Sequence, residues 1–319
     1  MRLCQFDSPG HNGPAVGVRS VAGNVIPLES LLREHGEGVP TDSVCSMVEF
    51  MEGCHAGRFS LAMLRGWVEK LTAAEESRFA LDIERLHLRA PVTTPPKFFA
   101  VAINGRANWD RSIKPPNPTA QYFIKLRTCL TGPYDPVEIP DIGSVGPEVE
   151  LALIIGRPGK NIPVTAATEH IFGYTIHNDL TAHALRERSE WIKLRRKDGS
   201  EQHLTYPGRW KNFDTFSPMG PWLVTADEIP DPHALNLWAK LNGELVQQGN
   251  SRDVVFRAPE LIAYLSQAHT LEVGDIISLG TVPPVEPWTM ASIDLRLHGG
   301  MIEAGIEGLG ALRNPIVRI

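Results

Sequence analysis

Two segments of the chain hold acidic residues at a spacing that could serve metal chemistry. In the first, residues 146–156, glutamates stand at positions 148 and 150. Neighbouring side chains of an extended strand point to opposite faces, so Glu148 and Glu150 share one face about 6–7 Å apart. The other face is predicted to be core because it is entirely apolar, consisting of Val149, Leu151, Leu153 and Ile155.

The third acid, Asp179, lies in the next strand-like run, on the same face as His177. A half-solvated strand with its glutamates in water is one interpretation. However, Ala152 and Ile154 continue the acidic face as apolar positions, which places the glutamates at the mouth of a partly buried surface. Buried carboxylates need a partner. Three carboxylates are hard oxygen ligands suited to Mg2+, Mn2+ or Ca2+, and they leave coordination positions open for water or substrate.

The elements that must position these acids belong to an ordinary globular chain. Its 319 residues are 42% hydrophobic and 21% charged, enough for two domains or one large domain with an appendage. No apolar run is long enough to span a bilayer and no hydrophobic leader follows Arg2, so a cytoplasmic protein without membrane contact is expected. The net charge of -6 argues against a nucleic-acid partner. The cysteines form no Cys-x-x-Cys pair and are predicted to be free thiols: Cys4, Cys45, Cys54 and Cys129.

A basic cluster interrupts the chain between the acidic segments and the C-terminal third. Glu187 and Glu190 lie inside it, which favours a solvated loop over a phosphate-binding patch. The basic residues are Arg186, Arg188, Lys193, Arg195, Arg196 and Lys197.

Breaks in the pattern divide the chain into a small N-terminal α+β domain, residues 1–92, and a larger domain, residues 93–319. Short strands are expected within residues 1–28, and an amphipathic helix behind a Ser60 cap follows them. Prolines at 91, 95 and 96 mark the linker.

The second domain is predicted to consist mainly of strands. Residues 98–103 form an apolar run that predicts a buried strand. Residues 106–119 predict an irregular loop or a short lid helix. Asn242-Gly243 is a signal for a two-residue hairpin turn.

Residues 95–319 resemble the fumarylacetoacetate hydrolase (FAH) superfamily, because they carry a series of short motifs in one order along the chain. The motifs that carry the resemblance are Pro-Glu-Val-Glu-Leu at 147–151, Phe-Gly-Tyr-Thr-Ile-His-Asn-Asp at 172–179, Lys-Asn-Phe-Asp-Thr at 211–215, Pro-Met-Gly-Pro at 218–221, Leu-Asn-Gly at 241–243, Gly-Thr at 280–281 and Gly-Leu-Gly at 308–310. The resemblance implies a mixed α/β protein that is mainly β, built as an FAH-type β-sandwich roll and assembled as a homodimer.

The same resemblance implies roles for individual residues. Mg2+ or Mn2+, with Ca2+ as an alternative, would be held by Glu148, Glu150 and Asp179. Lys211 would be catalytic. Hydroxyl groups of Thr215 and Thr281 would contact substrate.

The substrates that the resemblance implies are 2-oxo acids and 1,3-dicarbonyl compounds of the acylpyruvate type. Carbon-carbon cleavage, decarboxylation and proton transfer beside such carbonyls all build an enolate, which the cation and Lys211 would stabilise. The first expectation is therefore a metal-dependent hydrolase or lyase that cleaves a carbon-carbon bond in aromatic catabolism.

Departures from the family's pattern keep other reactions open. Asn108 and Arg111 stand where many relatives carry a His and a Glu in the lid, and neither side chain can act as a general base near neutral pH. His177 is the candidate replacement base, with a packed histidine as the alternative. His183 and Arg186 replace an Arg and a Gln at the carboxylate-binding end of the site. Loss of the lid pair equally suits an isomerase, tautomerase or dehydratase, and a binding-only protein is a third hypothesis.

Overall fold

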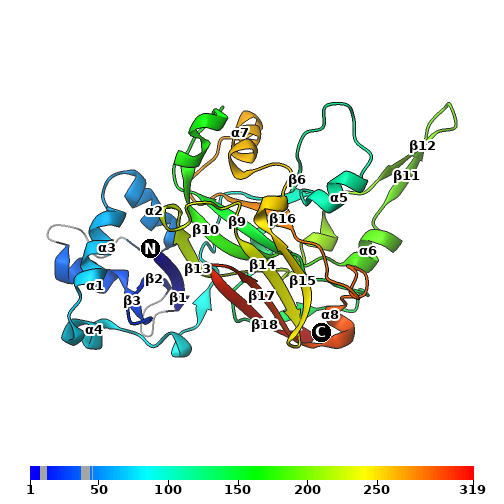
Figure 1. The fold of residues 1–319 in the computed structure, drawn as a ribbon. Coiled ribbons are helices and arrows are strands. Elements are labelled where there is room, and N and C mark those ends of the chain that lie inside the picture. Colours follow the sequence, from blue (N-terminus) through cyan, green and yellow to red (C-terminus); the bar gives the residue numbers. More distant parts are fainter. Residues whose placement is uncertain (8–12, 37–43, 45) are drawn as a thin grey trace.

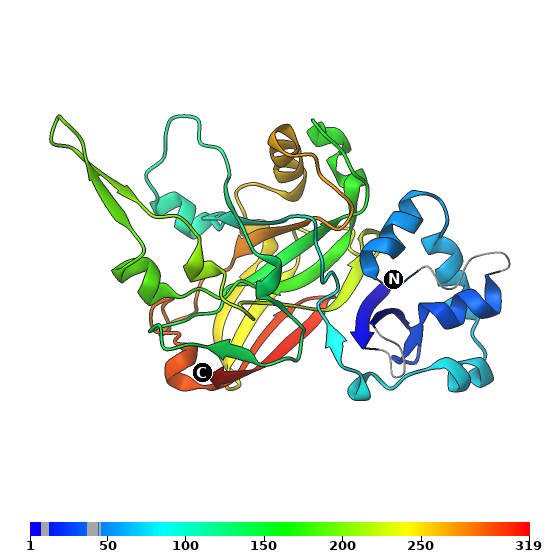
Figure 2. The same cartoon turned by 180° about the vertical axis from the view of Figure 1, so that it is seen from behind.

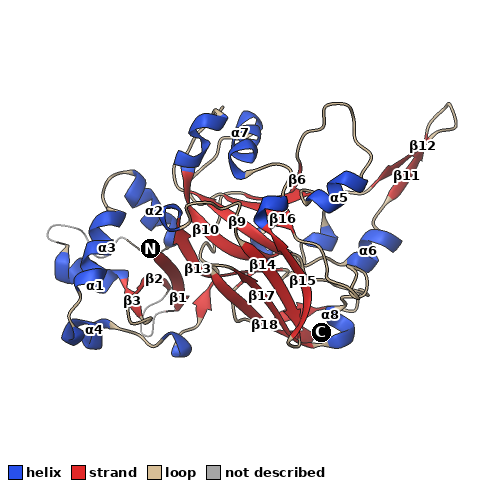
Figure 3. Ribbon diagram, in the orientation of Figure 1, coloured by secondary structure: helices blue, strands red, loops and turns tan. Residues whose placement is uncertain are grey.

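The computed structural model describes residues 1–7, 13–36, 44 and 46–319 (Figure 1). In this range the helices are α1 Leu28–His35, α2 Met47–His55, α3 Leu61–Lys70, α4 Ala73–Phe79, α5 Arg106–Arg111, α6 His183–Arg188, α7 Ala258–Ala268 and α8 Leu295–His298. The strands are β1 Arg2–Asp7, β2 Pro14–Arg19, β3 Val25–Pro27, β4 Leu88–Arg89, β5 Phe98–Ala102, β6 Gln121–Ile124, β7 Leu130–Thr131, β8 Val137–Ile139, β9 Val149–Ile155, β10 Ile171–Asn178, β11 Ile192–Arg195, β12 Glu201–Leu204, β13 Ser217–Thr225, β14 Asn236–Leu241, β15 Glu244–Asn250, β16 Ile276–Thr281, β17 Gly300–Ile306 and β18 Gly310–Arg318. The protein is therefore mixed α/β and mainly β, as predicted (Figure 3).

Two sheets form the body of the molecule. Among the described residues, eleven strands make one sheet, whose main path runs β3-β2-β1-β13-β10-β9-β16-β5-β6. A second sheet has the order β15-β14-β17-β18-β8. The strands that carry the acidic residues, β9 and β10, are antiparallel neighbours in the middle of the large sheet. Central strands are covered on both faces, which explains why every residue of β9 is buried.

Each face of the large sheet packs against a different layer. Val149, Leu151 and Leu153 of β9 belong to a core shared with the five-stranded sheet, which matches the predicted apolar face. Ala152 and Ile154 point the other way, into a core made with the N-terminal helices α1, α2 and α3. The predicted alternation is confirmed, and helices cover the Ala152 and Ile154 end of the acidic face.

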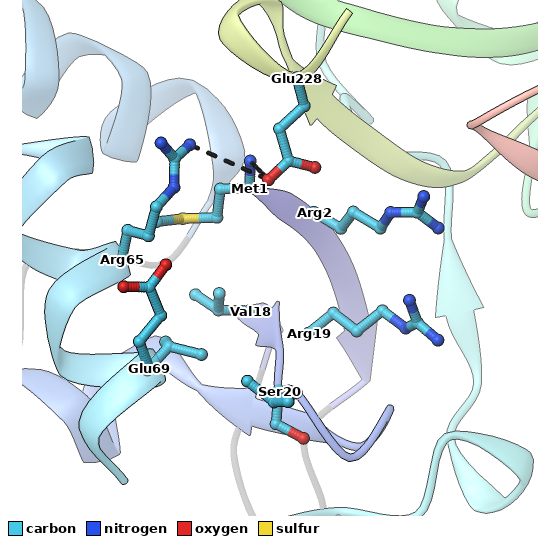
Figure 4. A pocket seen from close by; sticks show the side chains of 10 residues that line it. Met1, Arg2, Val18, Arg19, Ser20, Arg65, Glu69 and Glu228 are labelled. Atoms are coloured by element: carbon cyan, nitrogen blue, oxygen red, sulfur yellow. Dashed lines mark ion pairs between the residues drawn. The ribbon is translucent and has the colours of Figure 1, made fainter.

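The N-terminal strands extend the large sheet. β1 pairs with β13, with Leu3 opposite Leu223. Residues 1–92 therefore share both a sheet and a core with the rest of the chain, and the boundary at residues 92 and 93 stays a prediction. Polar contacts add to this junction. Arg65 of α3 pairs with Asp227 at 2.5 Å. Arg65 also forms an ion pair with Glu228 at 3.9 Å, beside a hollow of about 210 Å³ that both residues line with Met1 (Figure 4).

His87 ties the N-terminal strands to the larger domain. Its ring nitrogens lie 2.5 Å from a carboxylate oxygen of Asp7 and 2.7 Å from one of Asp135. Hydrogen bonds to these two acids raise the pKa of His87. A histidine whose pKa is raised in the folded state stabilises the protein fully below its unfolded pKa of about 6.5, and this contribution is lost as the pH rises through the folded pKa.

We therefore expect His87→Gln to lower the free energy of unfolding by less than about 1 kcal/mol at pH 5.5, since the group is largely exposed. The difference from wild type should shrink as the pH rises above about 6.5. Urea unfolding at several pH values measures it, with the exposed His55→Gln as control. A difference that grows with pH would contradict the assignment.

Several local predictions are confirmed. Ser60 caps α3, its hydroxyl accepting from the Met63 amide at 3.3 Å. Asn242 and Gly243 both have positive φ in the turn between β14 and β15. The described cysteines, Cys4, Cys54 and Cys129, are free, whereas Cys45 lies outside the described residues.

The prediction that residues 186–197 form a solvated loop is right about exposure and wrong about secondary structure. The segment is exposed, but it continues from α6 into a two-stranded hairpin, β11 and β12, that projects from the body at one corner (Figures 1 and 2). Apolar Ile192 and Leu194 alternate with charged Lys193 and Arg195, a pattern that predicts a strand. The interpretation from charge alone overlooked this pattern. No helix in the described parts of the chain is long and apolar enough to cross a membrane.

Candidate metal and substrate site

The three acids meet where β9 begins and β10 ends. Glu150 is in β9 opposite His177 of β10, and Glu148 and Asp179 flank these strands. The Asp179 amide donates to the Glu148 carbonyl oxygen at 2.8 Å, which fixes the two segments. One carboxylate oxygen from each acid lies within 4.8 Å of the other two. The convergence expected from strand alternation is therefore present.

Two buried lysines compensate the charge of this acidic triad, Glu148, Glu150 and Asp179. Lys211 donates to a Glu148 carboxylate oxygen at 2.8 Å and also contacts the Asp179 carboxylate. Lys125 donates to the other Asp179 oxygen at 2.7 Å, and its side chain is 0% exposed. When all three acids are ionised they carry one negative charge more than the two ammonium groups, and this excess favours a bound cation.

The protonation states follow from this arrangement. Burial alone would raise the pKa of Asp179, but the Lys125 and Lys211 ammonium groups outweigh it and hold that pKa well below its usual range. Burial would lower the pKa of Lys211, yet the neighbouring carboxylates raise it. Burial and the Asp179 charge raise the pKa of Glu150 to about 8. Glu150 is thus the member of the triad that most lacks a positive partner.

Sequence reasoning missed Lys125. It follows β6 directly and falls in phase with the buried Phe123, so a lysine at an inward position of a strand was the available signal. Its ammonium group also contacts the carbonyl oxygens of Lys211 and Phe216. One side chain therefore joins the acids to the segment that carries Lys211.

Glu150 is oriented by a chain of hydrogen bonds that includes His177. The carboxylate accepts from the Ser278 hydroxyl at 2.6 Å and from the Gly280 amide at 2.9 Å. Since the Ser278 proton is committed to Glu150, the His177 Nδ1, 2.8 Å from the Ser278 oxygen, is the donor to it. Burial lowers the pKa of His177 to about 3. The neutral ring therefore orients Ser278 through Nδ1, while its buried Nε2 has no hydrogen-bond partner among the described residues. The general-base role of His177 stays a prediction.

Loss of the Ser278 hydroxyl, which links His177 to Glu150, is expected to weaken metal binding. In Ser278→Ala, Glu150 keeps the Gly280 amide but loses its hydroxyl partner, and loss of such an outer partner typically costs 10–100-fold in metal affinity or activity. Calorimetric titration with Mn2+ measures the affinity, with Ser266→Ala as a buried control outside the site. An unchanged Mn2+ affinity in Ser278→Ala would contradict this role.

The two threonines assigned to substrate lie in different settings. Thr281 is opposite Glu150 across β16 and β9, and its hydroxyl donates to the Val149 carbonyl oxygen at 3.1 Å. Thr215 has φ of 65° in a turn, where its hydroxyl accepts from the Glu138 amide at 2.8 Å. Thr281 is therefore beside the triad, while the described contact of Thr215 is to a neighbouring backbone. Both substrate roles stay predictions.

His183 and Arg186 follow Asp179 on α6. His183 is buried, and burial with the Arg186 charge lowers its pKa to about 3; neither of its ring nitrogens has a hydrogen-bond partner. Arg186 lies over the Trp210 ring at 5.8 Å and pairs with Glu187 at 3.1 Å. The His183 nitrogens are thus buried without a partner in the described part of the chain, and the substrate-binding roles of His183 and Arg186 stay predictions.

The predicted lid is the short helix α5. Buried Asn104 anchors its start, donating to the carbonyl oxygens of Leu279 at 2.7 Å and Phe256 at 3.0 Å. Within α5, Arg111 donates to the Asn108 side-chain oxygen at 2.9 Å. A cavity of about 280 Å³ lies between α5, the end of β16 and the second sheet. Its wall includes Gly280, whose amide holds Glu150, so the cavity adjoins the triad.

The residues present fit a divalent cation. The donors are hard carboxylate oxygens, they are close together, and their charge exceeds that of the adjoining ammonium groups. A cation bound there would neutralise Glu150 and leave coordination positions for oxygen atoms of a ligand.

Comparison with known proteins agrees with this site. Residues 97–317 match the family model described as fumarylacetoacetate (FAA) hydrolase, C-terminal. Mitochondrial oxaloacetate tautomerase fahd2 of Xenopus laevis is 33% identical over 99% of this chain and 90% of its own length, and FAHD2B of Bos taurus, also an oxaloacetate tautomerase, is 35% identical over 99% and 92%. The solved structure of maleylpyruvate hydrolase from Sphingobium sp. SYK-6, in complex with manganese(II) and pyruvate, superposes with a TM-score of 0.69 at 27% identity, covering 100% of this chain and 99% of that one. The chain therefore belongs to the fumarylacetoacetate hydrolase family.

Proposed function

We propose that this protein is a divalent-metal-dependent enzyme that interconverts the keto and enol forms of a small 2-oxo acid. The observation that carries the proposal is the buried acidic triad with its two adjoining ammonium groups. The lid holds Asn108 and Arg111 at the positions where many relatives carry a His and a Glu. Such a site can stabilise an enolate, yet the lid offers no side chain at those positions to activate water.

The residues of the chain suit proton transfer next to a carbonyl. A Mg2+ or Mn2+ ion held by Glu148, Glu150 and Asp179 would draw electron density from paired substrate oxygens and so stabilise an enolate. In the enol-to-keto direction, the Lys211 ammonium delivers a proton to carbon and the enol hydroxyl proton returns to the amine. One O–H bond breaks, one C–H bond forms, and no water enters. Lys125 holds the Asp179 carboxylate in place during the exchange.

The relatives support this reaction class. The two vertebrate proteins described above are oxaloacetate tautomerases, and each aligns with nearly this entire chain. Oxaloacetate is a 2-oxo acid with a carboxylate and a ketone oxygen side by side, the arrangement that the site is suited to bind.

Carbon-carbon cleavage of an acylpyruvate, the first expectation from the sequence, is the second candidate. The cavity beside Gly280 favours it, because its wall is largely apolar, with Leu151, Leu237 and Leu279 in it, and could take an acyl group. The similarity to a structure described as maleylpyruvate hydrolase, in complex with manganese(II) and pyruvate, supports this candidate. Aromatic catabolism and the cytoplasmic location remain predictions.

Two assays on the same metal-loaded protein separate the candidates. We expect accelerated loss of the ultraviolet absorbance of enol-oxaloacetate, without release of pyruvate or carbon dioxide. Acetylpyruvate should yield little pyruvate in a coupled assay. Fast pyruvate release from acetylpyruvate with no effect on oxaloacetate would overturn the proposal in favour of cleavage.

The effect of the lid residues on the reaction can be tested by restoring the His and Glu that many relatives carry. Asn108→His combined with Arg111→Glu restores a general base and its acidic partner at positions three residues apart on α5. We expect a gain in acylpyruvate hydrolysis of about 10²-fold or more, the range of a positioned general base. Asn108→His alone serves as the control. No gain in the double variant would mean that the lid composition does not select the reaction.

A further inference from the structure

We propose that Gln247, a buried side chain of the second sheet, is a positioning residue that holds the two glutamates of the acidic triad in place. Gln247 lies in β15 and is 0% exposed. Its hydrogen bonds lead to Val149, the residue between Glu148 and Glu150. This inference rests on the cation site of the proposed function and not on the reaction carried out there.

The pairing of β9 with β16 is interrupted beside the triad. Its register shifts between Ser278 and Thr281, at Gly280, whose φ is 96°. The Gly280 amide donates instead to the Glu150 carboxylate, at 2.9 Å. An irregularity of this kind disrupts the hydrogen-bond ladder locally. Because β9 is buried, its backbone groups that face this gap need other partners.

Val149 is the residue whose backbone groups face the gap. The Glu148 carbonyl oxygen faces β10, where it accepts from the Asp179 amide. Successive residues of a strand direct their peptide groups to opposite sides, so both groups of Val149 face β16. The Val149 amide donates to the Gln247 side-chain oxygen at 3.3 Å, and its carbonyl oxygen accepts from the Thr281 hydroxyl at 3.1 Å. Two side chains therefore replace the missing strand partner.

The same hydrogen bonds fix the orientation of Gln247 and Thr281. The Gln247 side-chain nitrogen donates to the Val282 carbonyl oxygen at 2.9 Å and to the Thr281 hydroxyl at 3.3 Å. Since the Thr281 hydroxyl donates its proton to Val149, its oxygen is the acceptor for Gln247. A closed set of hydrogen bonds thus holds the backbone from which both glutamates project.

A second irregularity turns Gln247 inward. β14 places Ala239 opposite Gln247 and Lys240 opposite Leu245, so Val246 is an extra residue in β15. Val246 and Gln247 are both buried, although neighbours in a regular strand alternate between the two faces. Period-two alternation therefore could not identify this glutamine from the sequence.

Gln247→Met tests the proposal, because it keeps the length of the side chain and leaves the buried Val149 amide without its acceptor. We expect the Mn2+ affinity, measured by calorimetric titration, to fall about tenfold, the lower end of the range for loss of an outer partner of a metal ligand. In the metal-free protein, NMR should show faster hydrogen exchange of the Val149 amide than in wild type.

Gln5→Met is the matched control. Gln5 is 1% exposed, its oxygen accepts from the Met47 amide at 2.9 Å, and its nitrogen donates to the Thr93 hydroxyl at 3.0 Å, outside the site. Both variants should unfold at a lower urea concentration than wild type, whereas only Gln247→Met should weaken Mn2+ binding and speed the exchange of Val149. Unchanged Mn2+ affinity in Gln247→Met, or an equal loss in Gln5→Met, would overturn the proposal.

Variants of Thr281 give a second test that does not require Gln247→Met to fold. Thr281→Val loses the hydroxyl that supports Val149 and should weaken Mn2+ binding, whereas Thr281→Ser keeps the hydroxyl and should bind Mn2+ as wild type does. Wild-type affinity in Thr281→Val, or equal losses in the two variants, would contradict the proposed support of Val149. These titrations contain no substrate, so a protein that behaves as expected in them but does not act on oxaloacetate would refute the proposed function alone.

Discussion

Glu150→Gln is expected to abolish turnover while making the metal-free protein more stable. The substitution keeps the shape of the side chain, and the amide oxygen can still accept from Ser278 and Gly280. It removes one of three metal-binding carboxylates, so we expect Mn2+ affinity to fall at least 100-fold and kcat/KM at least 1,000-fold, about 4 kcal/mol of transition-state stabilisation.

The gain in stability follows from the buried charge. Burial and Asp179 raise the pKa of Glu150 in the folded protein to about 8. An acid whose folded pKa exceeds its unfolded value destabilises the folded state as the pH rises above the unfolded pKa, about 4.3. Removing this acid should therefore raise the free energy of unfolding at pH 7 by about 1–3 kcal/mol.

Urea unfolding in the presence of a chelator measures this stability, and calorimetry measures Mn2+ affinity. The exposed Glu169→Gln is the control for loss of a carboxylate and should change neither quantity appreciably. If Glu150→Gln kept its Mn2+ affinity, or lost stability in the metal-free state, the charge balance described for the triad would be incorrect.

Lys125→Met is expected to destabilise the metal-free protein by about 3 kcal/mol, because it removes one of the two ammonium groups that compensate the buried Asp179 carboxylate. Lys125 is fully buried and donates to Asp179 at 2.7 Å. Saturating Mn2+ should restore part of this loss, since a cation binds only the folded triad. At 100 times its dissociation constant a ligand adds about 2.7 kcal/mol.

Lys97→Met is a matched control for this rescue. Lys97 also donates to a buried carboxylate, that of Asp275 at 2.9 Å, but outside the triad. Both variants should lose stability in chelator, whereas only Lys125→Met should be stabilised by Mn2+ to a greater extent than wild type. Equal responses of the two variants to Mn2+ would show that Lys125 is structural and is not coupled to the cation site.

The parts of this protein that the sequence predicts are those with a short-range signal. Period-two alternation around Glu148 and Glu150 predicts both the inward apolar face and the side-by-side acids. The Asn242-Gly243 turn and the Ser60 cap depend on adjacent residues, and both occur where expected. Antiparallel pairing of β9 with β10, the next strand along the chain, brings Asp179 within reach of the glutamates.

What the sequence did not reveal depends on pairing between distant segments. The position of Lys125 against Asp179 requires β6 and β10 to belong to one sheet, and the extension of that sheet by β1 requires Leu3 to meet Leu223. Neither contact has a local pattern. Burial of Ala152 and Ile154 likewise comes from N-terminal helices that pack on them from another part of the chain. His177 shows the same limit, since its partner Ser278 is about 100 residues away.

The central claim is that Glu148, Glu150 and Asp179 hold one divalent cation to which a 2-oxo acid binds directly. Electron paramagnetic resonance of protein-bound Mn2+ with oxalate, an analogue of the enolate of pyruvate, labelled with oxygen-17 tests this most directly. We predict one bound Mn2+ per chain, absent in Glu150→Gln, whose lines broaden with the labelled oxalate. Lines that stay unchanged, or full Mn2+ binding by Glu150→Gln, would contradict the account.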